Sequence, residues 1–197
     1  MPDFEIRSFG YGMHAGFGTG FFTGTISEHF SPTLNFIFGF DFTYRKSIFY
    51  LNGTLAGGKV IQDYVSDKNW YKKQNANLAV IDISYGYAFL DNNKVKFAPF
   101  AGLGITELSG QNKDSKEDGL RLVDCNVIFG INADYKLQTR INLLPNPYFG
   151  AAVKEKVETS VRARLYVTRA NLTSDLSGYS VNLTIGLCGF GKMIRIK

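Results

Sequence analysis

Two histidines are the residues of this sequence best suited to proton transfer near neutral pH. His14 lies in a glycine-rich segment and is expected on the small-residue side of a strand. There it either supports a proton-linked activity or packs against an interior carboxylate, and we expect the packed histidine. His29 lies near Glu28 and Ser31, residue types that a lipid-modifying hydrolase uses. Because the spacing matches no nucleophile motif, we expect a solvated loop and no catalytic residue.

Acidic, amide and arginine side chains recur at the polar positions of segments that alternate in polarity. Paired carboxylates can serve a glycosidase as acid and base, but nothing in their spacing indicates a cleft. Acids and arginines can also line a gated ion path or form fixed ion pairs that set strand register. We expect fixed pairs. The candidate residues of this polar network are His14, Asn35, Asp41, Asp82, Asp124, Asn126, Asp134, Glu158, Arg162 and Arg164.

Other chemistry is weakly supported. Cys125 and Cys188 lack CxxC spacing and fall on opposite faces of different strands, so no disulfide is expected. No cluster of His, Cys and Asp has metal-ligand spacing, and the glycines near His14 follow a period of two instead of forming GxGxxG. We therefore expect no metal and no cofactor. Segments 63–73 and 111–118 carry both charge signs and are expected as hydrated loops.

The elements that would position these residues are strands. Large apolar residues alternate with small or polar ones in eight segments, at about 9–21, 34–44, 48–60, 79–89, 97–105, 123–135, 157–167 and 179–187. Closing such a sheet removes its exposed edges. The pattern predicts an all-β fold, a closed antiparallel up-and-down transmembrane β-barrel of about eight strands. Residues 1–8 are expected as an N-terminal extension and 9–197 as one barrel domain, with 136–156 either extending strands or forming a short helix.

Composition agrees with this fold. The 197 residues include 21 Gly and 17 Phe, and aromatic residues make up 15%, which disfavours a helical bundle. A hydrophobic content of 45% excludes global disorder. No run of 18 apolar residues is present, which excludes a transmembrane helix. The net charge of +5 comes from scattered lysines, so no nucleic-acid partner is expected.

Two barrels share this alternation. A soluble, lipocalin-like barrel would point its apolar face inward and bind a hydrophobic ligand. A membrane barrel would point the same face at lipid and pack its polar residues inside. The polar faces contain almost no Lys, and aromatic residues lie near the strand ends, as an interfacial girdle requires. These features favour the membrane barrel; the proposed girdle residues are Phe9, Tyr44, Phe89, Tyr135 and Tyr179.

Three segments resemble small outer-membrane β-barrel proteins of Gram-negative bacteria, of the porin-like Bacteroidetes type. They are Gly10-Tyr-Gly12 to Gly16-Phe-Gly18, Ala98-Pro-Phe-Ala-Gly-Leu-Gly104, and Gly178-Tyr-Ser-Val-Asn-Leu-Thr-Ile-Gly186. The resemblance spans about residues 9–191 and implies short periplasmic turns and longer external loops. One departure is the ending at Met193–Lys197, where such barrels often have an aromatic residue; Phe190 lies seven positions earlier. Either that signal is relaxed here or the last strand has a different register.

The resemblance implies a monomer in the lipid bilayer of the bacterial outer membrane. Its role would be structural, or recognition of an extracellular partner through exposed loops, with a side-chain-filled lumen and no enzymatic activity. The start, Met1-Pro-Asp-Phe-Glu, has no secretion signal, so a mature form is expected. The lipocalin-like barrel and a lipid-modifying outer-membrane enzyme remain the alternatives.

Overall fold

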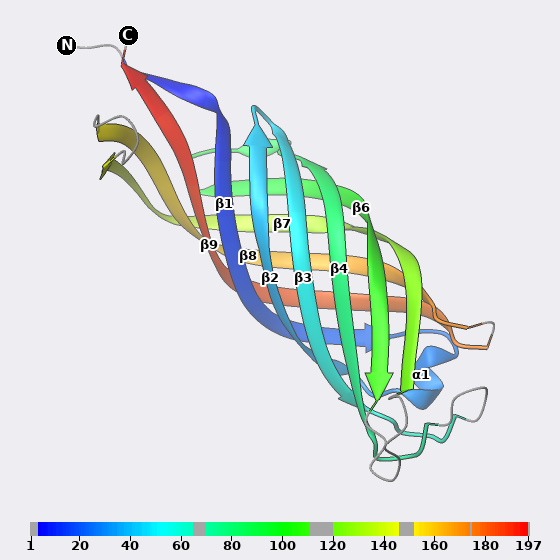
Figure 1. Ribbon diagram of the computed structural model, residues 1–197. Coiled ribbons are helices and arrows are strands. Elements are labelled where there is room, and N and C mark those ends of the chain that lie inside the picture. Colours follow the sequence, from blue (N-terminus) through cyan, green and yellow to red (C-terminus); the bar gives the residue numbers. More distant parts are fainter. Residues whose placement is uncertain (1–3, 65–69, 111–119, 146–151, 174, 197) are drawn as a thin grey trace.

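The computed structural model describes residues 4–64, 70–110, 120–145, 152–173 and 175–196, which form a slanted β-barrel (Figure 1). The strands are β1 (Phe4–Phe22), β2 (Thr33–Tyr44), β3 (Ser47–Lys59), β4 (Asn75–Tyr87), β5 (Leu90–Asp91), β6 (Val95–Gly110), β7 (Leu120–Pro145), β8 (Ala152–Asn171) and β9 (Ser177–Ile196). The four-residue helix α1 (Ile26–His29) lies after β1. Within the described ranges, no helix has the length and apolarity needed to cross a bilayer.

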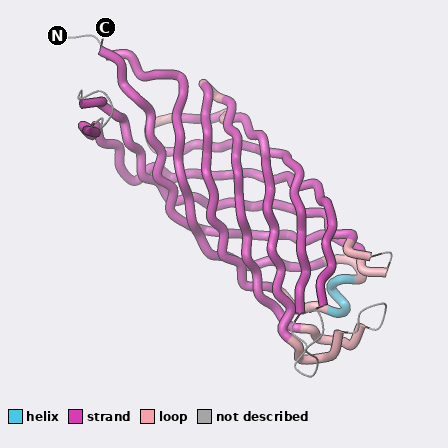
Figure 2. The backbone as a smooth tube through the Cα atoms, viewed as in Figure 1, coloured by secondary structure: helices cyan, strands magenta, loops and turns pink. Residues whose placement is uncertain are grey.

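The strands form a closed ring in chain order. Each long strand pairs antiparallel with the next, β4 pairs with β6, and β9 pairs with β1. The short β5 pairs only with β6, which leaves eight strands in the ring. Figure 2 shows the continuous strand wall. The predicted closed, antiparallel, up-and-down barrel is therefore confirmed.

The two ends of the barrel differ. What we call the loop end carries 23–32, the described parts of 60–74, and 172–176. What we call the terminal end carries both chain ends, the segment 88–94 and the tight β2–β3 turn, in which Tyr44 pairs with Ser47. The expected alternation of long and short connections holds for the first three, 23–32, 45–46 and 60–74, but the β8–β9 connection at the loop end is shorter than segment 88–94 at the terminal end.

The apolar face of the strands points outward. Leu34 is 79% exposed and Phe17 71% exposed, whereas Asp41 on the opposite face is fully buried. This is the facing of a membrane barrel and the reverse of what a lipocalin-like barrel requires. The expected girdle residues are all exposed on this face: Phe9, Tyr44, Phe89, Tyr135 and Tyr179.

At the terminal end, β7, β8, β9 and β1 continue past the ring as a protruding sheet (Figure 1). The ladder of β7 with β6 ends at Tyr135, but β7 continues along β8 to Pro145 after an irregularity at Lys136. The uncertain segment 136–156 is thus a strand extension in its described part. At the other edge, Phe4 already pairs with Ile196, so strand β1 begins inside the expected extension 1–8.

The register of β9 is the expected one. Leu183, Ile185 and Leu187 point outward, and Phe190 is buried on the inner face. The alternative of a shifted last strand is therefore wrong. Phe190 instead packs inside the barrel, where it lies against Gly10 and Gly12: a Cβ placed on either glycine would come within 3.0 Å of its ring.

Glycine on the inner face makes room for polar side chains. Gly20 of β1 lies beside an amide pair in which Asn35 Nδ2 donates to Asn182 Oδ1 over 2.7 Å. A Cβ on Gly20 would meet Asn182 Oδ1 and would lie 2.7 Å from Thr33 Oγ1. The lumen at this level has no space for another methyl group.

We expect Gly20→Ala to destabilise the folded barrel by about 1–3 kcal/mol, because the added methyl group displaces the Asn35–Asn182 pair. Urea unfolding in lipid vesicles, followed by the mobility of unboiled samples on gels, measures this. Gly57→Ala is the control, because nothing lies within 4 Å of a Cβ at that position. Equal stability of the two variants would contradict the crowded lumen.

Candidate functional site

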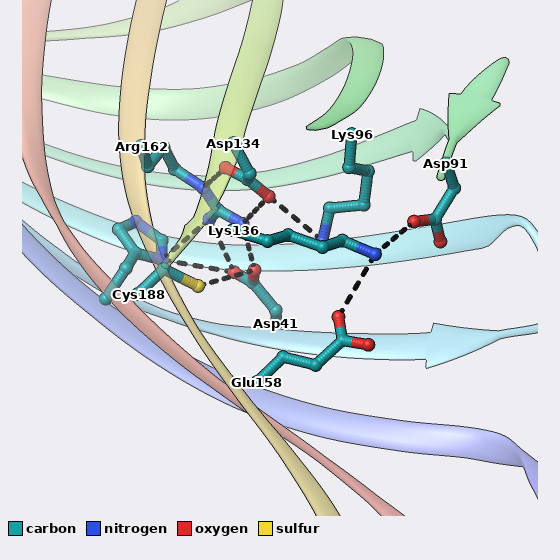
Figure 3. A network of polar contacts seen from close by, with 9 residues as sticks. Asp41, Asp91, Lys96, Asp134, Lys136, Glu158, Arg162 and Cys188 are labelled. Carbon is teal, nitrogen blue, oxygen red and sulfur yellow. Dashed lines mark hydrogen bonds and ion pairs between the residues drawn. The ribbon is translucent and has the colours of Figure 1, made fainter. Parts of the chain in front are cut away.

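Arg162 is the centre of a buried ion-pair cluster on the inner face of the barrel, where it bridges two carboxylates (Figure 3). It donates through Nη2 to Asp41 Oδ2 over 2.6 Å and through Nε to Asp134 Oδ1 over 2.7 Å. Second contacts of 3.2 Å to Asp41 and 3.1 Å to Asp134 make both pairs bidentate. His14 Nδ1 lies 3.1 Å from both Asp41 Oδ1 and Arg162 Nη1. Cys188 Sγ lies 4.0 Å from Asp41 Oδ2.

Lys96 completes the charge balance of this cluster. Its Nζ lies 2.9 Å from Asp134 Oδ2. Two cations, Lys96 and Arg162, thus face two carboxylates, Asp41 and Asp134, and the formal charges cancel. The sequence analysis missed Lys96, although its place next to the outward Phe97 indicates the inner face.

A second layer lies two residues further along β8, towards the loop end. Arg164 Nη2 lies 3.7 Å from Asp82 Oδ1, and the guanidinium carbon lies 4.0 Å from the ring centroid of Phe100. Asp82 also accepts hydrogen bonds from Asn52 Nδ2 over 2.7 Å and from Ser84 Oγ. A long ion pair and a cation–π contact compensate the buried Arg164 only in part, because its guanidinium nitrogens have no hydrogen-bond partner among the described residues.

The remaining predicted network residues lie at other levels. Asn35 joins Asn182, and Asn126 Nδ2 donates to Thr106 Oγ1, both towards the loop end. Asp124 lies on β7 opposite Thr106 and is only partly buried. Glu158 lies near the terminal end, 2.8 Å from Lys156 Nζ and 3.2 Å from Lys136 Nζ. The structure therefore brings His14, Asp41, Asp134 and Arg162 into one cluster and distributes the other predicted residues along the lumen.

The loop end of the lumen is closed by an apolar cap. Trp70 is fully buried and packs edge-on against Phe30, with ring centroids 5.5 Å apart. Ile26 of α1 and Leu176 are also buried in the cap. The expectation of a hydrated loop at 63–73 is therefore wrong for Trp70 and for Tyr64, which is 7% exposed. Their rings cover the apolar mouth of the barrel, a tertiary demand that local polarity does not reveal.

Two small cavities lie between the cap and the ionic cluster. One of about 20 Å³ lies among Ala56, Leu78 and Tyr166. Another of about 10 Å³ lies beside His14 and Arg164. A cavity of this size has room for about one water molecule. The described side chains fill the lumen from the ionic cluster to the cap.

The candidate nucleophile and base do not form a catalytic pair. His14 is buried with Asp41. His29 packs against the Tyr64 ring, and its Nδ1 lies 3.4 Å from the Gln62 carbonyl oxygen. Ser31 Oγ donates to the Pro32 carbonyl over 3.0 Å. Cys125 and Cys188 are free thiols, one exposed on the apolar face and one buried, and the described part of the chain contains no metal-ligand cluster.

Solved structures of other proteins have a fold similar to that of this chain. No protein-family model matches the sequence, and no curated protein matches it. Neisserial surface protein A has a TM-score of 0.55 at 13% identity over 93% of this chain and 97% of that one. Ail of Yersinia pestis has a TM-score of 0.48 at 9% identity, covering 92% of this chain and 97% of that one. The N-terminal β-barrel domain of Pseudomonas aeruginosa OprF has a TM-score of 0.43 at 12% identity, covering 93% of this chain and 99% of that one.

At these identities the likeness concerns the fold, and the comparison depends on the first structure, whose TM-score exceeds 0.5. The chain has the fold of small outer-membrane β-barrels, and its exposed apolar face is the one that a membrane barrel turns towards lipid. The Bacteroidetes-type detail stays a prediction.

We expect Arg162→Met to destabilise the barrel by about 3–5 kcal/mol, because Asp41 and Asp134 lose their shared buried counter-charge. Adding Asp41→Asn to this variant should restore much of the lost stability, because Asp134 keeps its ion pair with Lys96 and the remaining charges cancel. Arg121→Met removes an exposed ion pair with Glu107 and should cost at most about 1 kcal/mol. The free energy of unfolding in urea tests all three; equal losses for Arg162→Met and Arg121→Met would refute the central role of Arg162.

Proposed function

We propose that this protein is a monomeric barrel of the bacterial outer membrane that does not conduct solutes and acts through its loop-end surface. In this orientation the loop end faces outward from the cell and the terminal end faces the periplasm. The observation that supports this is the filled lumen. Ion pairs block the lumen beneath its terminal mouth, and the apolar cap closes its loop end.

Moving an ion through this lumen would require breaking the buried pairs of Arg162 with Asp41 and Asp134. Exposing one unpaired charge in such a site costs several kcal/mol. An eight-stranded barrel is only wide enough for its own side chains, so no parallel path is expected around the cluster. Transport is therefore the weakest of the roles open to this fold.

Recognition of a partner is supported by the ordered surface of the loop end. The cap residues hold the described loops together: the Tyr64 hydroxyl lies 3.1 Å from the Thr173 hydroxyl of another connection, and Tyr64 and Trp70 exchange two backbone hydrogen bonds of 2.8 Å within their own. A preorganised surface loses less conformational entropy when it binds a partner. Ile61 and Tyr71 are 44% and 50% exposed beside this cap and offer apolar contacts of the kind that interfaces use.

In planar lipid bilayers we expect no stable current steps from the folded protein, because both ion pairs of Arg162 remain closed. Heat-denatured protein added at the same concentration is the control for detergent artefacts. Reproducible steps whose size follows the salt concentration would overturn the non-conducting barrel.

The loop surface is tested with the protein in nanodiscs, passed over a glycan array and over immobilised serum proteins. We expect at least one binding signal that falls about tenfold in the variant Ile61→Ser/Tyr71→Ser, since each lost apolar contact costs about 1 kcal/mol or more. Ile141→Ser changes a residue that is 67% exposed at the terminal end and serves as the control. A signal unaffected by the loop variant, or no signal, would contradict recognition through this surface and favour a structural role.

A further inference from the structure

The terminal end contains a polar cavity of about 200 Å³ inside the barrel mouth. Basic side chains around it come from different parts of the ring: Arg45, Lys96, Lys136, Lys156 and Lys192. Its carboxylates are Asp91 and Glu158. Figure 3 shows Lys136 reaching between these two acids. The cavity thus has an excess of positive charge that the rest of the lumen does not have.

The acids are already engaged. Lys136 Nζ lies 2.6 Å from Asp91 Oδ1 and 3.2 Å from Glu158 Oε2, and Lys156 shares Glu158 at 2.8 Å. Lys96 is neutralised by Asp134 below the cavity. Among the described residues, no carboxylate lies within ion-pair distance of Lys192.

The placement of Lys192 is unfavourable without a counter-ion. Lys192 of β9 pairs directly with Lys156 of β8 in the strand register, and both side chains line the same cavity. Like charges directly opposite each other on neighbouring strands destabilise a sheet. Lys192 also lies over the Phe190 ring, with its Nζ 5.6 Å from the centroid, and is only partly exposed. A bound anion would relieve the repulsion between the two lysines.

We propose that this cavity binds a soluble, phosphate-bearing anion. Lysine binds phosphate as a point charge through its three donors, and several lysines around one cavity can satisfy the oxygens of a dianion. A concave site with one dominant sign of charge also concentrates such anions near it. The proposal concerns the terminal end and does not depend on recognition at the loop end.

The ligand is a free phosphate compound and not a lipid headgroup, because the cavity opens inside the ring. On the outer side of the wall, Phe9, Tyr44 and Tyr135 are exposed at this level as the expected girdle. These aromatic residues would mark the boundary with the headgroups. The wall strands therefore separate the cavity from the lipid.

The test is calorimetric titration of the folded, full chain with inorganic phosphate at low ionic strength, with acetate in parallel. We expect phosphate to bind more tightly than acetate, because the dianion contacts more of the lysines. Lys192→Gln should weaken phosphate binding about tenfold or more, the value of one charge-assisted contact. Equal or tighter binding of acetate, or no phosphate binding, would overturn the proposal.

Matched variants separate binding from folding. Lys46→Gln removes the same charge from the terminal end but does not line the cavity, and should leave phosphate binding unchanged. Asp91→Asn frees Lys136 from one acid and should tighten phosphate binding, an effect that a damaged fold cannot produce. Equal losses in Lys192→Gln and Lys46→Gln would refute the site. In nanodiscs, an affinity that varies with phosphatidylglycerol content would instead assign the anion to a lipid headgroup.

Discussion

The seam between β1 and β9 is the constraint on which the rest of this structure depends. In a hydrocarbon environment an unpaired backbone edge costs several kcal/mol for each polar group, so the ring must close. The first and last strands pair from Phe4↔Ile196 to Phe22↔Ser180. Gly16 faces Gly186 in this ladder, and a Cβ on Gly186 would meet the backbone of Ala15 and Gly16. Small residues at the seam therefore allow the two strands to come within hydrogen-bonding distance.

Closure with eight strands leaves a narrow interior, and its contents follow from that width. The inner face is polar, so each charged group must find its partner within the lumen. Arg162 satisfies Asp41 and Asp134 together, and Lys96 balances the remaining charge. The neutrality of this cluster explains how so many ionisable side chains are buried together.

The two ends of the lumen have opposite chemistry. At the loop end, Trp70 and Phe30 belong to the apolar cap, which is built largely from residues of the connections between strands. At the terminal end, Lys156 and Lys192 stand opposite each other around an open polar space. The barrel thus has an apolar cap at one end and a cavity lined by charged side chains at the other, two surfaces of different chemistry.

The sequence by itself determined the strands, their two faces and the meander. Apolar and polar residues alternate with a period of two along each strand, and this pattern can be recognised within one short segment. A soluble barrel and a membrane barrel have the same alternation. The placement of aromatic residues and lysines favoured an outward apolar face, but only the tertiary structure showed that this face points outward. Partners depended on closure: Arg162 meets Asp41 from 121 positions away. Lys96, the buried Trp70 and the strand extension within 136–156 were decided in the same way. Each depends on which side chains the closed ring brings to one level, a relation between distant strands that no local pattern contains.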